Sequence, residues 1–205
     1  RHTRRVYDRL YRGHLNLTVL FLIFSLRMVL MQTLLDEKQL RDGVRKMAQD
    51  ITDHYEGRPL TIIGILTGSV VLLADMIRLL EMPLRVGVLQ ARSYHGATTT
   101  RGELVINDEL MPDIQNREVL LVDDIFDTGY TLREVISRIK KLNPSSVLSA
   151  VLLHKEDRCE VEMAPDFVGF HIPDKFVVGY GLDYEDEYRN LPYLAALEEA
   201  DLKSH

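Results

Sequence analysis

The stretch Val119-Leu-Leu-Val-Asp-Asp-Ile-Phe-Asp-Thr-Gly-Tyr-Thr-Leu132 decides the fold. Its first residues belong to the segment Glu118-Val-Leu-Leu-Val122, whose apolar residues predict a strand buried on both faces. After a polar turn, apolar residues recur at spacings of three and four from Leu132 to Leu142, which predicts a helix that Asn143-Pro144 ends. A strand followed at once by a helix is the repeating unit of a mostly parallel sheet.

The same alternation of strands and helices extends along the chain on both sides of this stretch. Before the central strand we expect a helix capped by Asp36 and ending near Gly57, a strand at Leu60–Leu66, a helix at Val70–Leu80 and a strand at Leu84–Ala91. A hairpin follows, with its tip at Ser93–Gly102 and its return strand at Glu103–Ile106. After the central unit we expect a strand at Ser146–Leu153, short strands at Phe167–Phe170 and Phe176–Val178, and a terminal helix at Tyr193–Leu202. The fold class is therefore α/β, with helices on both faces of the sheet and ligands beyond the carboxyl ends of its strands.

Composition places the chain among ordinary globular proteins. Its 205 residues suit one domain, and 46% hydrophobic with 27% charged residues can build a full core. The formal net charge of -6 argues against a protein built to grip nucleic acid, which usually carries a basic surface. Cys159 is the only cysteine, so no intramolecular disulfide forms, as suits a reducing cytoplasm.

Residues 1–33 differ from the rest. Five arginines between Arg1 and Arg12 precede the apolar run Val19–Leu26, which is shorter than the ~20 residues of a membrane span and lacks a small-residue cleavage site after it. Our interpretation is a non-native or mis-started extension, because the chain does not begin with Met and Met28 and Met31 lie close to the first helix. A membrane anchor over residues 15–31, or an extra packed helix, are the alternatives. We therefore expect an extension at 1–33 and one domain at 34–205.

Acidic and small residues follow the central strand in a chemically useful order. Asp123 and Asp124 come at its carboxyl end, Asp127 follows, and Thr128-Gly-Tyr-Thr131 opens the helix. Free amides at a helix amino end attract phosphate, and Gly129 lets the backbone approach it. The paired carboxylates can accept hydrogen bonds from ribose hydroxyls. The alternative is a plain strand–turn–helix junction with Asp as a cap and Thr-Gly as turn residues.

At these residues the sequence resembles the phosphoribosyl pyrophosphate motif of type I phosphoribosyltransferases. The resemblance implies that Asp123 and Asp124 bind the ribose hydroxyls, although the first acid is more often Glu in that family. It implies that Asp127, Thr128, Gly129, Tyr130 and Thr131 cradle the 5-phosphate. It also implies the type I phosphoribosyltransferase fold, a twisted, mostly parallel sheet with a small hood and a flexible hairpin loop.

Features further along narrow the resemblance to hypoxanthine–guanine phosphoribosyltransferases, over about Leu35 to Leu194. They are Lys155 in Leu152-Leu-His-Lys-Glu-Asp157, the run Phe176-Val-Val-Gly-Tyr-Gly-Leu-Asp-Tyr184, and Arg189. By resemblance, Lys155 donates to the purine O6, Phe176 stacks on the ring, the Val177 backbone bonds the Watson–Crick edge, Asp183 lies near Mg²⁺ and the base, and Arg189 reaches the pyrophosphate. The alternatives are a solvated lysine, a core aromatic, a turn-forming aspartate and an ion-paired arginine.

Two loops complete the resemblance. Thr67-Gly68-Ser69 stands where the family binds pyrophosphate through its backbone, often next to a non-proline cis peptide. Relatives commonly carry Lys or Arg at the position of Thr67, so only the backbone role carries over. Ser93-Tyr94 matches the start of the family's flexible loop. An ordinary exposed hairpin is the alternative.

The implied activity is purine salvage: the 5-phosphoribosyl group moves from phosphoribosyl pyrophosphate to N9 of hypoxanthine or guanine, giving IMP or GMP and pyrophosphate. Mg²⁺ would lie near Asp123, Asp124 and Asp183, and Asp127 would take the proton from N7. A cytoplasmic homodimer or homotetramer is implied, with no nucleic acid and no membrane. The alternatives are a sister enzyme for xanthine, adenine, uracil or orotate, a regulator that binds RNA or DNA, and a membrane-anchored form.

Overall fold

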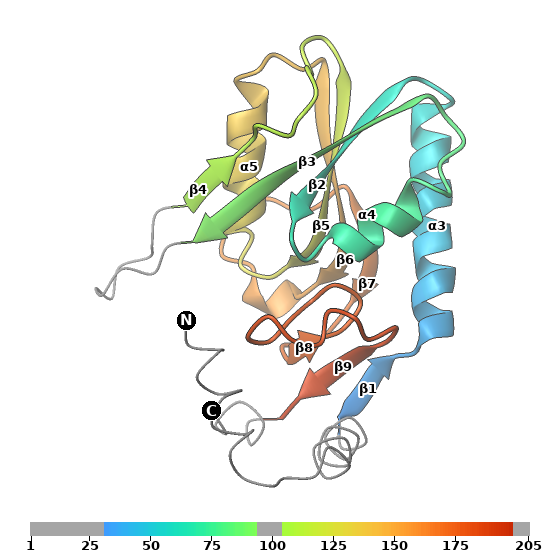
Figure 1. The fold of residues 1–205 in the computed structure, drawn as a ribbon, viewed down its shortest axis with the longest axis vertical. Coiled ribbons are helices and arrows are strands. Elements are labelled where there is room, and N and C mark those ends of the chain that lie inside the picture. Colours follow the sequence, from blue (N-terminus) through green and yellow to red (C-terminus); the bar gives the residue numbers. More distant parts are fainter. Residues whose placement is uncertain (1–30, 94–103, 199–205) are drawn as a thin grey trace, which may run out of the picture. The chain divides into compact units, whose positions relative to one another are not determined.

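The chain is described by a computed structural model for residues 31–93 and 104–198. One compact unit spans Thr33–Ala196, and a six-stranded sheet in the order β4-β3-β2-β5-β6-β7 forms its centre (Figure 1). The strands are β2 (Leu60–Leu66), β3 (Leu84–Ser93), β4 (Leu104–Asn107), β5 (Glu118–Phe126), β6 (Ser146–His154) and β7 (Phe167–His171). Neighbouring strands are parallel except β3 and β4, which pair antiparallel. The expected mostly parallel sheet and the two strands of the hairpin are confirmed.

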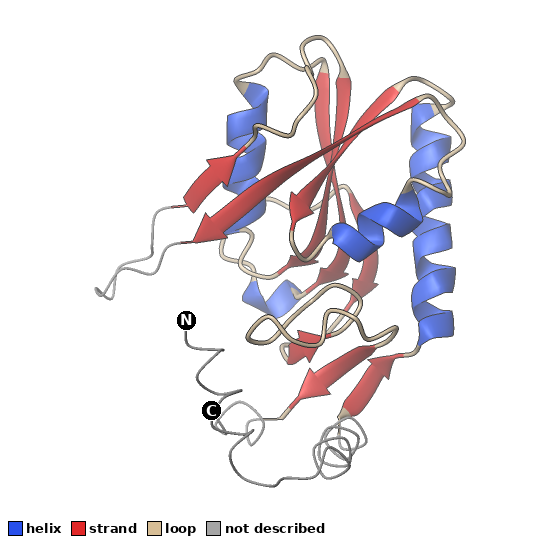
Figure 2. Cartoon of the chain, viewed as in Figure 1, coloured by secondary structure: helices blue, strands red, loops and turns tan. Residues whose placement is uncertain are grey.

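Successive residues of the central strands point into two different cores. Ile62 of β2 and Leu120 of β5 belong to the core that includes α3 (Glu37–Tyr55) and α4 (Val70–Met76). Their chain neighbours Ile63 and Leu121 belong to the core that includes α5 (Tyr130–Lys140). Helices lie on both sides of the sheet (Figure 2). Because side chains alternate across a strand, an unbroken apolar run serves both faces.

Helix α3 begins where the sequence predicts. The Gln39 amide donates to Oδ1 of Asp36 (2.7 Å), and the Asp36 amide donates to Oε1 of Gln39 (2.9 Å), which together form a capping box. Such a cap typically contributes about 1 kcal/mol. The buried face carries the residues with spacings of three and four, namely Leu40, Val44, Met47, Ile51 and Tyr55. Glu56 then takes a left-handed conformation and ends the helix.

A second, three-stranded sheet has the order β1-β9-β8, from β1 (Gln32–Leu35), β9 (Leu194–Leu197) and β8 (Phe176–Val178). The terminal helix expected at Tyr193–Leu202 is wrong for 194–197, and residues from 199 lie outside the described range. Leu-Ala-Ala-Leu favours a helix by propensity, but this segment is the middle strand and all four residues are buried. Pairing on both sides overrides a weak local preference. Strand β1 also begins inside the stretch that sequence reasoning set aside.

Other boundaries moved by a few residues. Helix α4 ends at Met76 rather than Leu80, because residues 77–79 form turns. Strand β5 runs on to Phe126, since Asp123, Ile125 and Phe126 continue the pairing with β6. The paired acids therefore lie within the strand and not after it.

Several expectations fall outside the described residues. They concern the apolar stretch and possible anchor before residue 31, the hairpin tip that includes Tyr94, and the end of the chain from 199. Within the described ranges, no helix combines the length and the apolar character needed to cross a membrane.

Candidate active site

A cavity of about 240 Å³ opens at the carboxyl ends of β2 and β5. Seven of the residues that the sequence singles out line it, namely Gly68, Asp123, Asp124, Asp127, Thr128, Gly129 and Thr131. Thr67 and Tyr130 adjoin these residues without lining the cavity. The cavity lies beyond the carboxyl ends of parallel strands, where the sequence predicts that ligands bind.

Burial disfavours the ionised form of the adjacent carboxyl groups of Asp123 and Asp124. Asp123 is 7% exposed, and burial, then the negative charge of Asp124, raise its pKa well above the usual range. Burial also raises the pKa of Asp124, although hydrogen bonds from Asp123 and from the Ile125 amide oppose this (N–Oδ1, 2.9 Å). Two adjoining carboxyl groups that lose water without a cation favour a shared proton. A bound cation or ribose hydroxyls would supply the missing partners, so this pair fits Mg²⁺ by its donor chemistry.

The amino end of α5 faces this cavity and is shaped for an anion. Gly129 takes φ +84°, and a Cβ there would lie 2.4 Å from Val161 and 2.7 Å from the Phe126 ring, so only glycine fits. Among the described residues no side chain caps the amino end of α5. Thr128 and Thr131 add hydroxyl groups to the same wall. These are the elements of a phosphate site at a helix amino end.

The loop after β2 packs on the acidic pair. The Leu66–Thr67 peptide bond is cis, as the resemblance implies. Ser69 is buried and its hydroxyl donates to the Ile65 carbonyl (2.6 Å), which holds the loop closed. The Cα of Gly68 lies so close to Asp124 that a Cβ would stand 1.6 Å from its Oδ2. Strand β2 thus delivers backbone groups, not a charged side chain, to the edge of the cavity.

Lys155 is buried, not solvated. It follows β6, where its amide donates to the Phe126 carbonyl (3.0 Å), and its side chain is 8% exposed. Its Nζ lies 3.7 Å from Oδ2 of Asp127 and 3.5 Å from Oδ1 of Asp174. Arg158 contacts the other carboxylate oxygen of Asp127, with Nε 3.0 Å from Oδ1. The structure therefore brings Lys155 and Asp127 together.

Phe176 presents an accessible aromatic face. It is 42% exposed, which excludes the reading of a core aromatic. Its ring meets Tyr184 edge-on, with centroids 5.4 Å apart and an angle of 85°. Val177 beside it is buried, so its backbone is held in place. An exposed ring braced by a second aromatic is suited to stack on a flat ligand.

Asp183 and Arg189 are engaged with each other. Nη2 of Arg189 lies 2.8 Å from Oδ1 of Asp183, and Nη1 donates to the Gly181 carbonyl (2.8 Å). Asp183 also accepts from the Asp186 amide (2.9 Å). Arg189 lines a separate cavity of about 600 Å³ beside α3 and α4, yet its charge still opposes the rise that burial causes in the pKa of Asp124. Asp183 therefore has the contacts of a turn-forming aspartate and Arg189 those of an ion-paired arginine, as in the alternative interpretations.

Three residues that contact the site were assigned no role from the sequence. Arg158 and Asp174 pair with Asp127 and Lys155, and Tyr184 braces Phe176. Arg158 lies three residues after Lys155 and Tyr184 ends the run beginning at Phe176, so proximity to the motifs was the only available clue. Of the expected residues at the hairpin, Tyr94 is outside the described range and Ser93 is described only as the last residue of β3.

Comparison with known proteins agrees with this geometry. Residues 31–185 match the family described as phosphoribosyl transferase domain. The hypoxanthine-guanine phosphoribosyltransferase of Staphylococcus epidermidis is 40% identical over 169 residues, which cover 82% of this chain and 94% of that protein. Its counterpart in Staphylococcus aureus is 37% identical over the same length and shares.

Solved structures show the same likeness. A hypoxanthine-guanine phosphoribosyltransferase from Bacillus anthracis superposes with a TM-score of 0.77 at 35% identity, covering 82% of this chain and 98% of that one. The hypoxanthine phosphoribosyltransferase of Trypanosoma cruzi gives 0.78 at 32% identity, covering 83% and 97%. The expected type I fold and the resemblance drawn from residues 119–132 are confirmed, and the chain belongs to the phosphoribosyltransferase family.

Proposed function

We propose that this chain is a purine salvage enzyme, which transfers the 5-phosphoribosyl group of phosphoribosyl pyrophosphate to N9 of hypoxanthine or guanine. The products are IMP or GMP and pyrophosphate. The named activities of the relatives at 37–40% identity support this assignment. The choice of base rests on the chain's own residues, and above all on the pair formed by Lys155 and Asp127.

That pair carries the proposal because its polarity matches one edge of a 6-oxopurine. Nζ of Lys155 and Oδ2 of Asp127 lie 3.7 Å apart, a donor beside an acceptor. O6 and N7 lie side by side on the purine, so Lys155 donates to O6 while Asp127 accepts the proton of N7. Adenine carries an amine instead of O6, and its donor would oppose the lysine. A buried donor left unpaired costs about 1–3 kcal/mol, which disfavours adenine.

The rest of the pocket places the sugar. Asp123 and Asp124 accept hydrogen bonds from the ribose hydroxyls, and the amides at 128–131 with the two threonine hydroxyls hold the 5-phosphate. Phe176 covers the purine face, and the Val177 backbone meets its Watson–Crick edge. These assignments are supported by the shared cavity and by the exposed Phe176 ring.

Magnesium would be held at the carboxylates of Asp123 and Asp124, with Asp183 near it. It would supply a Lewis acid that neutralises the leaving pyrophosphate. Gly68 and the Thr67 backbone would bind the pyrophosphate, as would Arg189 once it turns from Asp183. Ser93 and Tyr94 are assigned to the same group on their motif alone.

Asp127 is the residue to which we assign proton transfer in the reaction. As N9 attacks ribose C1 and the bond to pyrophosphate breaks, Asp127 takes the N7 proton as a general base. Arg158 fixes the carboxylate, since its Nε lies 3.0 Å from Oδ1, leaving Oδ2 toward Lys155. Most of the rate enhancement would then come from positioning and from preorganised charges.

We also propose the extent of the catalytic domain, the cellular compartment and the oligomeric state. The catalytic domain comprises residues 34–205, the protein acts in the cytoplasm, and it forms a homodimer or homotetramer. Sedimentation of the full chain would test the last point, since a monomer at micromolar concentration would contradict it. Fractionation of cells that express the authentic reading frame would test both the compartment and the alternative of a membrane anchor at residues 15–31.

The decisive experiment is a panel of bases with labelled phosphoribosyl pyrophosphate. Hypoxanthine, guanine, xanthine, adenine, uracil and orotate would each be incubated with the enzyme, with and without Mg²⁺, and nucleotide products separated. We expect labelled IMP and GMP only when Mg²⁺ is present. Nucleotide formation from adenine or a pyrimidine at a comparable rate would contradict the assignment to 6-oxopurines.

A further inference from the structure

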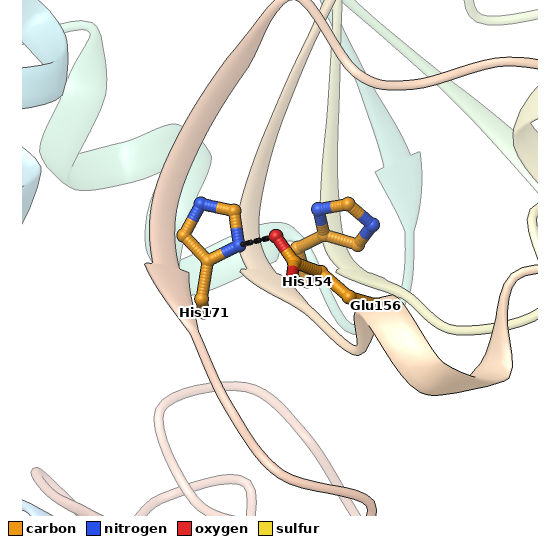
Figure 3. Close-up of side chains that lie close together, drawn as sticks. All are labelled: His154, Glu156 and His171. Carbon is orange, nitrogen blue, oxygen red and sulfur yellow. Dashed lines mark ion pairs between the residues drawn. The ribbon is translucent and has the colours of Figure 1, made fainter.

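Two histidines and a glutamate gather at the carboxyl ends of β6 and β7 (Figure 3). Each of His154, Glu156 and His171 offers a ligand atom, and these atoms lie within 4.8 Å of one another. Nδ1 of His171 lies 2.9 Å from Oε1 of Glu156. No step of the proposed reaction uses any of the three.

Sheet register explains why they meet. His154 is the last residue of β6 and pairs with His171, the last residue of β7, so their side chains project from the same face. The Ile172 amide donates to the His154 carbonyl (3.0 Å), which fastens the two strand ends together. Glu156 begins the short helix η1 (Glu156–Arg158), two residues after His154. The cluster is thus built on a paired sheet edge.

A second observation points to a ligand. Nδ1 of His154 is buried and has no hydrogen-bond partner within the described ranges. In Figure 3 this nitrogen lies on the side of the ring toward Glu156 and His171. The edge-on contact with Phe126, at 5.1 Å between centroids, holds the ring in that orientation. A buried nitrogen without a partner is costly, and a ligand between these side chains would satisfy it.

We propose that His154, Glu156 and His171 bind a divalent transition metal ion of the zinc class, at a site separate from the Mg²⁺ of the reaction. Imidazole and carboxylate ligands suit zinc, whereas Mg²⁺ prefers oxygen ligands alone. Ligand atoms of a tetrahedral zinc site lie about 3.3 Å apart for bonds of about 2.0–2.1 Å. Rotation of the exposed Glu156 and His171 brings the atoms to that spacing, and water takes the fourth position.

The protonation of His154 agrees with this role. Burial, and then the charge of His171, lower the pKa of His154, which keeps its imidazole neutral near pH 7. A neutral ring has the free electron pair that a metal needs. When the metal binds, Glu156 exchanges its contact with His171 for a shared ion.

A metal here would stiffen the part of the active site that contacts the base. Lys155 lies between His154 and Glu156 in the chain, and Arg158 ends the same short helix. Joining Glu156 to both strands would hold the segment that carries these two cations. Metal binding itself does not depend on the proposed activity, so the two ideas can fail separately.

Zinc binding by the full-length chain provides the test. Zn²⁺ would be titrated against a competing chromophoric chelator, with Mg²⁺ in excess to occupy other carboxylates and without substrates. The variants are Glu156→Gln and His171→Ala, both at exposed positions that leave the core intact. We expect one zinc site in the parent chain and a loss of more than about tenfold in its affinity in either variant, since losing even a second-shell partner costs roughly 10–100-fold.

Two controls exclude other ligands. His54→Ala removes an exposed histidine on α3, and Cys159→Ser removes the exposed thiol of the residue that follows η1. Both should keep the site. Co²⁺ in place of zinc should give tetrahedral visible bands without a thiolate charge-transfer band. Equal zinc affinity in the parent and both cluster variants, or loss of the site in Cys159→Ser, would overturn the proposal.

Discussion

The carboxylate of Asp124 lies directly against the Cα of Gly68, so that a Cβ built on Gly68 would stand 1.6 Å from Oδ2. Strand β5 and the loop after β2 therefore touch at the point where the acidic pair meets the cavity. The Gly68 carbonyl is in turn close to Gly181, whose own Cβ would lie 2.2 Å from it. Backbone from three separate segments converges here, which limits the side chains that the site tolerates.

Gly68→Ala should displace Asp124 and disable the pocket. An added methyl group in so tight a contact typically costs 1–3 kcal/mol, so we expect a lower melting temperature and at least a tenfold weaker affinity for phosphoribosyl pyrophosphate with Mg²⁺. Calorimetric titration measures the affinity. Gly57→Ala is the control, because Gly57 has open space around it and a positive φ that alanine adopts only with strain. This control should lower the stability without changing the affinity for phosphoribosyl pyrophosphate. An equal loss of affinity in the two variants would show that the contact between Gly68 and Asp124 is not what maintains the pocket.

Asp123→Asn should stabilise the ligand-free protein while weakening sugar binding. The folded pKa of Asp123 is raised, so its contribution to stability is full below the unfolded pKa of about 3.9 and is lost as pH rises through the folded value. Asn keeps the Oδ1 that accepts from the Asp124 amide (3.1 Å) and needs no proton. We expect a melting temperature several degrees higher at about pH 8, at 2–4 °C per kcal/mol, and a smaller gain near pH 5.

Melting curves across this pH range check the sign of that effect. Asp53→Asn, which removes an exposed carboxylate of α3, separates burial from the loss of one negative charge. A gain for Asp123→Asn that is the same at every pH would contradict burial as its cause.

Lys155→Met should raise the KM for hypoxanthine and leave that for phosphoribosyl pyrophosphate nearly unchanged. Methionine fills much of the buried space but donates nothing to O6. A hydrogen bond from a charged donor contributes about 1.5–3 kcal/mol, which corresponds to roughly 10–100-fold in KM. Steady-state kinetics with each substrate varied in turn provide the measurement. If purine kinetics stay normal, Lys155 does not contact the base.

Arg158→Gln should lower kcat about tenfold with little change in either KM, because Arg158 holds the Asp127 carboxylate without reaching a substrate. Arg138→Gln is the matched control: it too is about half exposed and ion-paired, but its partner Asp108 does not line the cavity of the acidic pair. Its kcat should match the parent. A similar fall in both variants would indicate a general electrostatic effect rather than positioning of Asp127.

Sequence reasoning located the sheet and the pocket because both are encoded locally. Unbroken apolar runs predict buried strands, and the order of Asp123, Asp127 and Gly129 predicts a strand, a turn and a phosphate-binding helix start. Strand β9 was not predicted, because Leu-Ala-Ala-Leu becomes a strand only by pairing with β1 and β8. Local preference cannot reveal such pairing.

Contacts that depend on how distant segments align were not predicted, for the same reason. Arg158 meets Asp127 across 31 positions of chain, and His154 meets His171 only because β6 and β7 align at their last residues. Neither pair forms a motif. The buried state of Lys155 likewise follows from the packing around it and not from its sequence neighbours.

The most direct test of the account is the kinetics of Asp127→Asn, which keeps the shape of the side chain and removes the base. We predict that kcat for IMP formation falls by 10²–10⁴-fold, the usual contribution of a general base, while the Kd for phosphoribosyl pyrophosphate changes less than about threefold. Turnover close to that of the parent enzyme would contradict proton transfer to Asp127 and with it the proposed reading of the O6–N7 edge.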